Sequence, residues 1–283
     1  MFIGHRCSAF GGHTVKRYLS LGAGVQSSTL AFMIERGEVE PVVAAVFSDT
    51  GDEPEAVYDW LKFIEQNVSF PVHRVSAGKL SDESTRLRLS KLSGKTYLAP
   101  ALPVHLLNLD GKKGMGLRQC TRNHKIDPIN KFLRVHAGVP RGAKFPHVDV
   151  LIGISTDEAL RMKPPQKPWL KNSWPLIEVG MSRQQCLEWM ETRGYPKPPR
   201  SACVFCPYKS DAEWIFLRDT DPVSFATAVQ YETRLQKAYE QSTALKSVPY
   251  LHASLKPLSE VEFTDRGKVA DQFNNECEGM CGV

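Results

Sequence analysis

The chain has 283 residues, 42% of them hydrophobic and 24% charged, which is typical of a globular protein with one large core or two small ones. Its formal charge of +5 permits polyanionic partners such as nucleic acid without requiring them. No segment approaches the ~20 apolar residues that span a bilayer, and the opening MFIGHRCSAFGGH lacks the apolar stretch of a secretory signal. We therefore expect a cytoplasmic protein with no membrane partner, whose seven cysteines act as thiols or metal ligands.

The first half of the chain alternates between strand and helix patterns. The apolar run PVVAAVF at 41–47 is typical of a parallel strand buried on both faces, whereas 27–36 has apolar residues on one helical face. This alternation predicts an α/β fold with a doubly wound parallel sheet and right-handed crossovers. The expected strands are 15–21, 41–47, 71–76 and 148–154, and the expected helices here are 27–36 and 53–66.

The remaining segments are less regular. Residues 78–116 are rich in Lys, Ser, Leu and Gly, which predicts a mobile loop or a lid over the sheet. After Lys163 the chain becomes proline-rich around one helix pattern at 181–193. We therefore expect an α/β domain at 1–165 and a C-terminal extension at 166–283 that packs on it.

A glycine-bearing turn, LSLGAGVQSST at 19–29, lies between the first expected strand and the first expected helix. Backbone N–H groups at a helix start bind anions, and small residues let phosphate oxygens approach. No Gly-Lys-Ser/Thr follows, and the third glycine of a dinucleotide fingerprint would fall at Ser27. The turn therefore predicts an anion site, with a tight turn that binds nothing as the alternative. The residues that fit the site are Ser20, Gly22, Ala23, Gly24, Ser27, Ser28 and Thr29.

The turn resembles the PP-loop of the ATP pyrophosphatase and phosphoadenosine-phosphosulfate (PAPS) reductase superfamily, whose pattern is Ser-Gly-Gly-x-Asp-Ser. The pattern falls on 22–27, with Gly22 in place of the leading serine and Gln26 in place of the acid. The resemblance implies a Rossmann-like PP-loop fold that binds an adenine nucleotide, either ATP or PAPS. The residues implied to hold its phosphate or sulfate end are Ser20, Gly22, Gly24, Ser27 and Ser28.

The segment FSDTGDEPE at 47–55 follows the second expected strand. Asp49 and Thr50 would lie at the carboxyl end of a parallel strand, where open α/β sheets bind ligands. The alternative is that Asp49 caps the following helix. The segment resembles the Asp-Thr-Gly-x-x-x-x-Glu segment of PAPS-reductase-like proteins, which implies that Asp49 lies beside the nucleotide.

A basic cluster occupies RQCTRNHKIDPI at 118–129. Its cations can meet phosphate or sulfate, although a solvated helix face gives the same pattern. The segment resembles the Cys-x-x-x-Lys-x-x-Pro-Leu segment of sulfonucleotide reductases. Residues 153–161 (GISTDEALR) resemble Gly-x-Arg-x-Asp-Glu-Ser-x-x-Arg of the same family, with Ser155 in place of an arginine. The cations implied to stabilise anionic charge are Arg118, Arg122, Lys125 and Arg161.

Cys203-Val-Phe-Cys206-Pro is a CxxC motif, whose two thiolates can chelate one metal ion or one cluster iron. Cys120 is the best third ligand, because its segment resembles the one that carries cluster cysteines in the family. Three ligands would leave one iron of a [4Fe–4S] cluster open, as in the transfer-RNA thiolation enzymes of this superfamily. A structural zinc site and a metal-free CxxC are the alternatives.

The terminal sequence NECEGMCGV at 275–283 contains two further cysteines. Single-cysteine reductases of the family end in Glu-Cys-Gly, and both Cys277 and Cys281 resemble that nucleophile. A thiolate beside the basic cluster would be nucleophilic because its pKa would be lowered. The alternative is a metal-binding or unpaired terminus.

These patterns predict a PAPS reductase-like, nucleotide-binding enzyme of sulfur chemistry. It would either reduce a sulfonucleotide or transfer sulfur to a nucleic acid in an ATP-dependent reaction. Its partners would be a thiol or sulfur donor and, for the second reaction, tRNA or DNA; a homodimer is left open. The alternative is a non-catalytic nucleic-acid-binding module with a structural zinc. A further set of cations near the CxxC motif, either a solvated face or a nucleic-acid contact, is Lys163, Lys167, Lys171, Lys197, Arg200 and Lys209.

Overall fold

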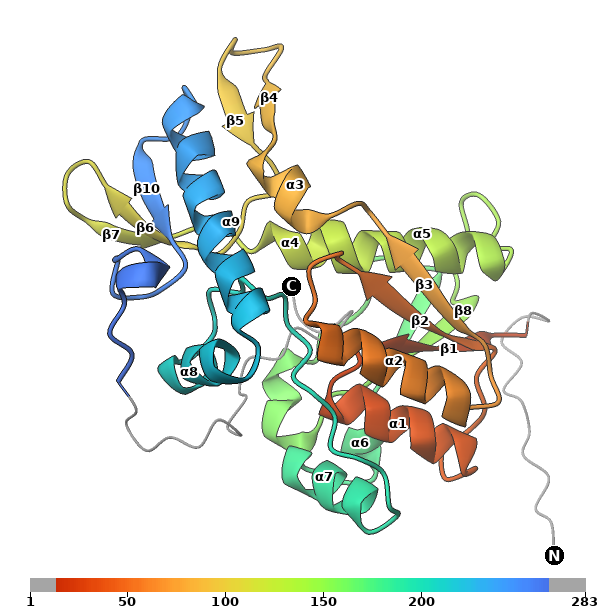
Figure 1. The fold of residues 1–283 in the computed structure, drawn as a ribbon. Coiled ribbons are helices and arrows are strands. Elements are labelled where there is room, and N and C mark those ends of the chain that lie inside the picture. The colour runs from red at the N-terminus through yellow and green to blue at the C-terminus, as the bar shows by residue number, and fades with distance from the viewer. Residues whose placement is uncertain (1–13, 265–283) are drawn as a thin grey trace, which may run out of the picture.

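A five-stranded parallel sheet forms the centre of the molecule, in a computed structural model that describes residues 14–264 (Figure 1). Its strand order is β3-β2-β1-β8-β9, and every neighbouring pair is parallel. The strands are β1 (Lys16–Leu21), β2 (Ala44–Asp49), β3 (Val72–Ser76), β8 (Val148–Ile152) and β9 (Leu170–Ser173). The α/β class expected from the sequence is therefore confirmed.

Helices cover both faces of the sheet, as the alternation of buried side chains requires. Leu19 and Leu21 of β1 point into a core shared with one group of helices, whereas Tyr18 points into a core on the opposite face. Figure 1 shows the first group below the sheet and α5 above it. The helices are α1 (Val25–Glu35), α2 (Glu55–Asn67) and α7 (Arg183–Glu191) on the first face, and α5 (Asp127–His136) on the second.

Helix α1 differs from its expected form, because it is buried on all sides instead of one. Residues 25–34 are all buried. The short helix α6 (Pro175–Glu178) and α7 cover its outer side, where Leu176 and Cys186 pack against Val25. A buried helix at the end of the glycine turn fixes the position of that turn.

A second group of elements, which we call the α9 lobe, packs beside the sheet. Trp214, Tyr231 and Leu235 form its core together with Leu80 and Leu102. The lobe contains α3 (Leu80–Thr85), β4 (Leu87–Leu89), β5 (Thr96–Leu98), β6 (His105–Asn108), β7 (Lys113–Met115), α8 (Asp211–Thr220), α9 (Pro222–Gln241), β10 (Ser247–Tyr250) and the 3₁₀ turn η3 (Leu258–Glu260).

The expectation of a mobile loop or lid at 78–116 is corrected by this lobe. The segment forms α3, the β4–β5 hairpin and two strands of the antiparallel sheet β10-β6-β7. Its leucines, including Leu102 and Leu106, pack in one core with side chains of α9, which lies more than a hundred residues later in the chain. Local patterns therefore gave no sign of the ordered structure.

The packing crosses the expected boundary between 1–165 and 166–283 in both directions. Strand β9 completes the central sheet from beyond the boundary, while 78–116 belongs to the α9 lobe. A separate C-terminal extension is therefore not confirmed. No described helix is both long and apolar enough to cross a membrane.

Candidate active site

The glycine turn joins β1 to α1 at the carboxyl edge of the sheet. Gly24 is the N-cap of α1, and its carbonyl oxygen accepts a hydrogen bond from the Ser28 N–H at 3.0 Å. Ala23 has a φ of 58°, so the chain turns through the left-handed region there. No side chain caps the helix. The N–H groups of the first turn are therefore the natural donors to an anion.

The serines of the turn mainly brace the loop. Ser27 Oγ accepts from the Gly22 N–H at 3.2 Å and lies 3.4 Å from the Gly24 carbonyl oxygen, to which it donates. Ser28 Oγ accepts from Trp60 Nε1 at 2.8 Å. Both serines are fully buried, and the predicted phosphate-contacting residue Ser20 is buried beside them. Backbone amides, rather than these hydroxyls, would carry most of an anion's binding.

Two other segments clamp the turn. Gly153, just after β8, approaches so closely that a Cβ atom there would lie 2.7 Å from the Ser27 nitrogen and 2.9 Å from the Gln26 carbonyl carbon. On another side the buried Ser201 hydroxyl donates to the Gly22 carbonyl oxygen. The turn is thus held in shape before any ligand arrives.

Gln26 links the start of α1 to the 3₁₀ helix η2 (Thr156–Arg161). Its Nε2 donates to Ser155 Oγ at 3.3 Å and to Glu158 Oε2 at 2.9 Å. Glu158 also pairs with Arg161, so this predicted anion-binding cation is held by a carboxylate. Gln26 Oε1 is buried and has no hydrogen-bond partner among the described residues. The site therefore contains a buried acceptor whose hydrogen-bonding capacity is unused by the described residues.

Asp49 braces the loop that follows β2. One oxygen, Oδ1, accepts from the Gly51 N–H at 2.7 Å and from the Tyr58 hydroxyl at 2.9 Å. Burial and the nearby Asp49 raise the pKa of Tyr58, which therefore stays a donor. Helix α2 is capped at Pro54 without a side-chain bond, so Asp49 does not cap it.

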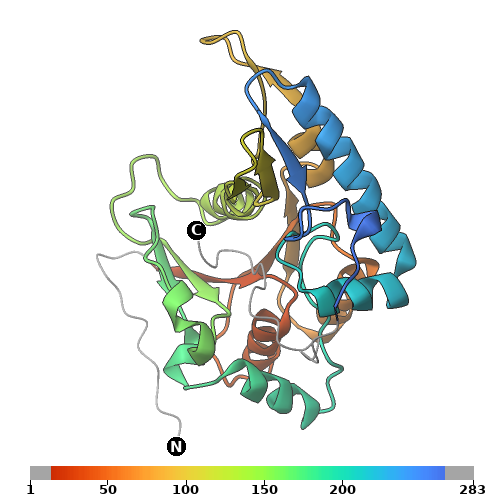
Figure 2. The same cartoon turned by 90° about the vertical axis from the view of Figure 1, so that its left-hand side faces the viewer.

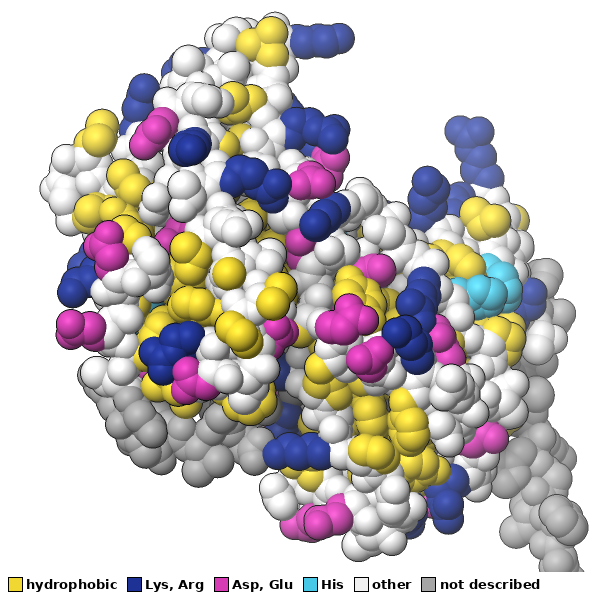
Figure 3. Space-filling view, viewed as in Figure 1, with side chains coloured by type: hydrophobic (Ala, Val, Ile, Leu, Met, Phe, Trp, Pro, Cys, Tyr) yellow, Lys and Arg dark blue, Asp and Glu magenta, His cyan; other side chains and the backbone are white. Residues whose placement is uncertain are grey.

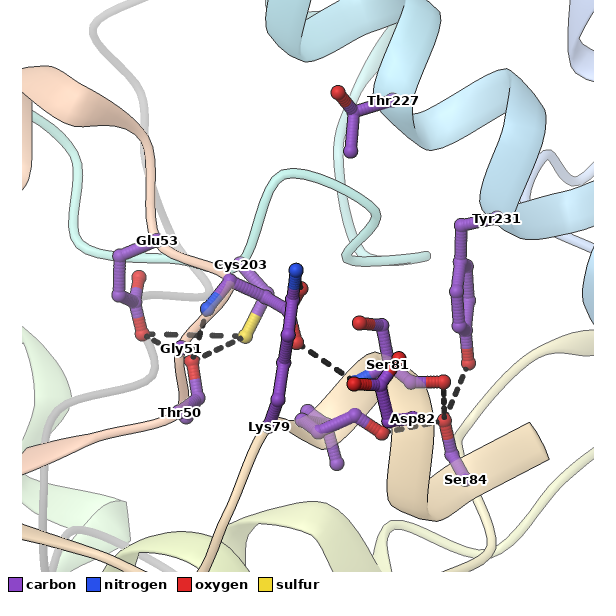
Figure 4. A network of polar contacts seen from close by, with 12 residues as sticks. Thr50, Gly51, Glu53, Lys79, Ser81, Asp82, Ser84, Cys203, Thr227 and Tyr231 are labelled. Carbon is purple, nitrogen blue, oxygen red and sulfur yellow. Dashed lines mark hydrogen bonds and ion pairs between the residues drawn. The ribbon is translucent and has the colours of Figure 1, made fainter. Parts of the chain in front are cut away.

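A buried cluster of a thiol, a carboxylate and an ammonium group adjoins this loop, and Figure 4 shows the thiol of Cys203 and the carboxylate of Glu53. Cys203 Sγ lies 3.4 Å from Thr50 Oγ1 and 3.9 Å from Glu53 Oε1. The same carboxylate oxygen lies 3.5 Å from Lys125 Nζ, and the two side chains are only 0% and 6% exposed. Burial, with the nearby Glu53, raises the pKa of the Cys203 thiol. A protonated thiol beside a buried ion pair is the result.

The CxxC motif forms a tight turn against the sheet. The Cys206 N–H donates to the Cys203 carbonyl oxygen at 3.0 Å, and the Val204 N–H donates to the Asp52 carbonyl oxygen at 2.9 Å. Lys209 Nζ reaches the Cys203 carbonyl oxygen at 2.8 Å, and burial lowers the pKa of Lys209 to about 8. The motif is therefore fixed to the end of β2.

The predicted anion-binding cations differ in their surroundings. Lys125 is committed to Glu53, whereas Arg118 lies over the Tyr208 ring at 5.3 Å and donates to Thr121 Oγ1 at 3.1 Å. Arg122 is exposed at the start of a π-helical turn (Arg122–Ile126). Arg118 and Arg122 thus remain the better candidates for contact with an anionic ligand.

The set of cations near the CxxC motif does not form a uniform patch. Arg200 pairs with Glu213, and Lys171 lies 3.4 Å from Asp149. Lys209 is turned inward to the CxxC turn. Three of the six cations therefore have partners within the chain, which weakens the interpretation of the set as a nucleic-acid contact.

Comparison with known proteins gives similarity to solved structures only. No family model matches the chain, and no curated protein matches it by sequence. A phosphoadenylyl-sulfate (PAPS) reductase from Candida auris, solved as a phosphate complex, is 14% identical with a TM-score of 0.40, over 65% of this chain and 75% of that one. The U34-tRNA thiolase NcsA from Methanococcus maripaludis, solved with its [4Fe-4S] cluster, is 14% identical with a TM-score of 0.34, over 79% of this chain and 72% of that one.

At this identity and these TM-scores the similarity concerns the course of the backbone alone. What the present chain binds and does therefore has to be argued from its own side chains.

The described cysteines supply only part of a metal site. Cys120 is partly buried and packs against the same α9-lobe core as Cys203. Among residues 14–264, however, no three His, Cys, Asp or Glu side chains gather as metal ligands. Two CxxC thiols do not complete a site for a [4Fe–4S] cluster or zinc. The predicted roles of Cys277 and Cys281 lie outside the described residues and stay predictions.

Three residues of the site were not predicted from the sequence. Glu53 is one of three acids in GDEPE, and no pattern shows which of them points inward. Ser201 lies in the aperiodic stretch PPRSAC, and its bond to the glycine turn joins residues far apart in the chain. Lys209 was grouped with surface cations, because its burial depends on the α9 lobe.

Proposed function

We propose that the protein is an adenine-nucleotide-dependent enzyme of sulfur chemistry. The anionic end of the nucleotide binds at the first turn of α1, and the CxxC thiols act next to it. Support comes from the location of both features at the carboxyl edge of one parallel sheet, where open α/β sheets bind ligands.

One observation carries this proposal. The segment from Ser201 to Cys203 touches both ligand-binding loops, because Ser201 bonds to Gly22 of the glycine turn and Cys203 contacts Thr50 after β2. A sulfur atom is therefore fixed beside an anion site by two short contacts. A CxxC turn that served only packing would need neither of them.

The roles of the side chains follow from their contacts. Backbone amides of 25–27 hold the phosphate or sulfate, and Arg118 and Arg122 add positive charge from α4 (Gln119–Thr121) and its flanks. Gln26 fixes η2 against the turn through Glu158. Cys203 is held as a thiol, so its use as a nucleophile requires loss of the proton.

Two reactions fit this arrangement. One is reduction of a sulfonucleotide such as PAPS by a thiol, with Cys277 or Cys281 as the nucleophile. The other is ATP-dependent transfer of sulfur to a nucleic acid, with tRNA or DNA as the acceptor and a sulfur donor as the second partner. Pyrophosphate release from ATP that depends on nucleic acid marks the second reaction, and turnover of PAPS marks the first.

Nucleotide binding is tested with Gly153→Ala. Its Cβ atom would displace the backbone of Ser27, so we expect affinity for ATP or PAPS, measured by calorimetry, to fall about tenfold or more. Gly114→Ala is the matched control, since its Cβ atom would meet nothing closer than 3.7 Å. Absence of any nucleotide binding by the unaltered protein would overturn the proposal.

The thiols are tested separately. Cys203→Ser with Cys206→Ser should abolish turnover while leaving nucleotide affinity unchanged, and Cys277→Ser with Cys281→Ser tests the tail. Cys186→Ala is the control, because it removes a buried thiol in α7 away from the site. Turnover that survives loss of both thiol pairs would contradict sulfur chemistry at this site.

The metal content decides among the cofactor alternatives. Iron, sulfide and zinc are measured on the full chain purified without oxygen. Iron and sulfide with broad absorption near ~400 nm indicate the [4Fe–4S] cluster of the first interpretation. Stoichiometric zinc in a colourless protein without nucleotide affinity indicates the non-catalytic, nucleic-acid-binding alternative.

A further inference from the structure

The positive charge of the chain is concentrated in one segment. Residues 84–113 contain a single acid, Asp110, and six cations. With 36 Lys and Arg against 31 Asp and Glu in the whole chain, the remainder holds 30 of each sign, so this segment accounts for the entire formal charge of +5. The cations are Arg86, Arg88, Lys91, Lys95, Lys112 and Lys113. Charge separated in this way is typical of a surface that meets a polyanion.

Much of this charge lies on a projecting β-ribbon, the β4–β5 hairpin. Figures 1 and 2 show the hairpin extending beyond the body of the molecule, next to the end of α9. The ribbon is clamped there close to its turn, at the Leu89–Thr96 pair: Thr96 and Thr243 exchange two backbone-to-hydroxyl bonds of 2.8 Å, and Ser242 Oγ donates to the Thr96 carbonyl oxygen at 2.7 Å. The ribbon is therefore an ordered arm held in one position.

The tip of the hairpin carries the cations that have no acidic partner. Arg86 and Arg88 share Glu83, at 2.9 Å and 2.6 Å. Lys91 and Lys95 are exposed, and neither forms an ion pair with a described residue. Figure 3 shows dark blue side chains projecting from this end of the molecule. Two lysines are thus available to an external anion.

Apolar side chains accompany these lysines. Leu92 at the tip is 100% exposed, and Leu89 is 66% exposed. Exposed leucines between lysines are poorly explained by solubility, because they add apolar surface to a charged arm. They suit a partner that offers apolar groups beside its phosphates, as the thymine methyl groups of a DNA major groove do.

We propose that the β4–β5 hairpin docks duplex DNA, with the ribbon in the major groove and Lys91 and Lys95 on the backbone phosphates. The major groove of B-DNA, about 12 Å wide, admits a two-stranded ribbon, whereas the deep, narrow major groove of an RNA duplex does not. Phosphate contacts supply the affinity, and Leu92 contacts the base edges.

The arm is connected directly to the candidate site. Helix α3 precedes the hairpin, and its Leu80 N–H donates to the Thr50 carbonyl oxygen at 2.9 Å. The Ser81 N–H donates to Asp52 Oδ2 at 2.7 Å. The start of α3 is thereby joined to the loop that contacts Cys203. The docking of DNA is independent of the proposed function. Only the further step, in which the docked DNA is the sulfur acceptor, rests on the proposed function.

The test is binding of a fluorescent DNA duplex of about 20 base pairs to the full chain, followed by anisotropy across about 50–200 mM NaCl. The variant Lys91→Ala with Lys95→Ala should bind about tenfold more weakly, with a log–log salt slope smaller by about 2, since each phosphate contact contributes about 0.9. The matched control is Lys131→Ala with Lys144→Ala, two exposed lysines elsewhere, which should leave affinity and slope unchanged.

Leu92→Ser provides a second test, because it removes an apolar side chain from the tip without changing the charge. It should weaken binding to the duplex while leaving the salt slope unchanged. Affinity and slope that are the same in the Lys91/Lys95 variant, or reduced equally in the control, would overturn the proposal. So would tighter binding to an RNA duplex of the same sequence or to anionic lipid vesicles. Calorimetry with ATP and PAPS on the same variants tests the proposed function independently, because the hairpin is remote from the glycine turn.

Discussion

Side chains around the glycine turn mostly bind one another, and the buried pair of Glu53 and Lys125 is the most costly of these contacts to break. Glu53 is completely buried, and one of its oxygens, Oε2, has no hydrogen-bond partner among the described residues. Loss of its paired cation would leave a buried carboxylate whose oxygen Oε1 keeps its contacts with Thr50 and Cys203, with Lys209 nearby. A pair of this kind holds a site in shape more than it stabilises the fold.

We therefore expect Lys125→Met to lower the free energy of unfolding by about 3–5 kcal/mol, because it leaves the carboxylate uncompensated. Urea denaturation followed by circular dichroism measures the change. The double variant Lys125→Met with Glu53→Gln removes both charges and should recover more than about 1 kcal/mol of that loss. Simple addition of the two single effects would show that the pair does not interact energetically.

At the scale of elements, one carboxylate of α9 bonds both the residue that follows β10 and the turn η3. Glu232 accepts from the Leu251 N–H at 2.7 Å and from the Leu258 N–H at 2.6 Å. Burial raises the pKa of Glu232, while the two N–H groups oppose that change. A second bond from α9 to β10 comes from Gln236 Nε2, which donates to the Pro249 carbonyl oxygen at 3.0 Å, whereas Leu258 is bonded by Glu232.

Glu232→Ala should lower the free energy of unfolding by about 2–5 kcal/mol, since two buried N–H groups would lose their acceptor at about 1–3 kcal/mol each. Urea denaturation again measures the loss. Glu240→Ala, an exposed position on the same helix, is the control and should change stability by less than about 0.5 kcal/mol. An equal effect of the two substitutions would refute the anchoring role of Glu232.

The same scale shows which elements the sequence can predict. Strand β2 is predictable because its apolar run needs no partner to be recognised. Helix α7 lies within the expected helix at 181–193, and the structure adds a capping box of Ser182 and Gln185 at its start. Strand β9 was missed, since it is an edge strand, LKNS, with one fully buried residue. Its identity comes from pairing with β8, which no local pattern records.

The candidate site was predictable to a similar degree. The glycine turn and the CxxC motif are local patterns, and the structure brings them together through Ser201 and Cys203. The paired state of Lys125 and Arg161 was not predictable, because their carboxylate partners are chosen by tertiary packing. Charge patterns in a sequence therefore overestimate the number of cations available to a ligand.

Over the whole molecule, polar contacts couple the loop after β2 to the α9 lobe and to the CxxC turn, and Asp52 makes two of them. Its carboxylate accepts from Ser81 at the start of α3, and its carbonyl oxygen accepts from Val204 in the CxxC turn. Helix α3 is in turn bonded to α9, because Ser84 Oγ lies 2.8 Å from the Tyr231 hydroxyl (Figure 4). Asp52 therefore connects the candidate nucleotide site to the hairpin arm.

Asp52→Ala should loosen α3 without unfolding the sheet. The Ser81 N–H would lose a buried acceptor, at a cost of about 1–2 kcal/mol, which corresponds to five- to thirtyfold faster amide exchange in α3 and the β4–β5 hairpin. Hydrogen–deuterium exchange with mass spectrometry measures this, with α5 as the internal reference that should not change. Asp219→Ala, at an exposed acid paired only with Arg218, is the control. Coupling confined to α3 predicts faster exchange in α3 and the hairpin alone. Faster exchange throughout the chain would contradict it and would mean that Asp52 supports the whole fold.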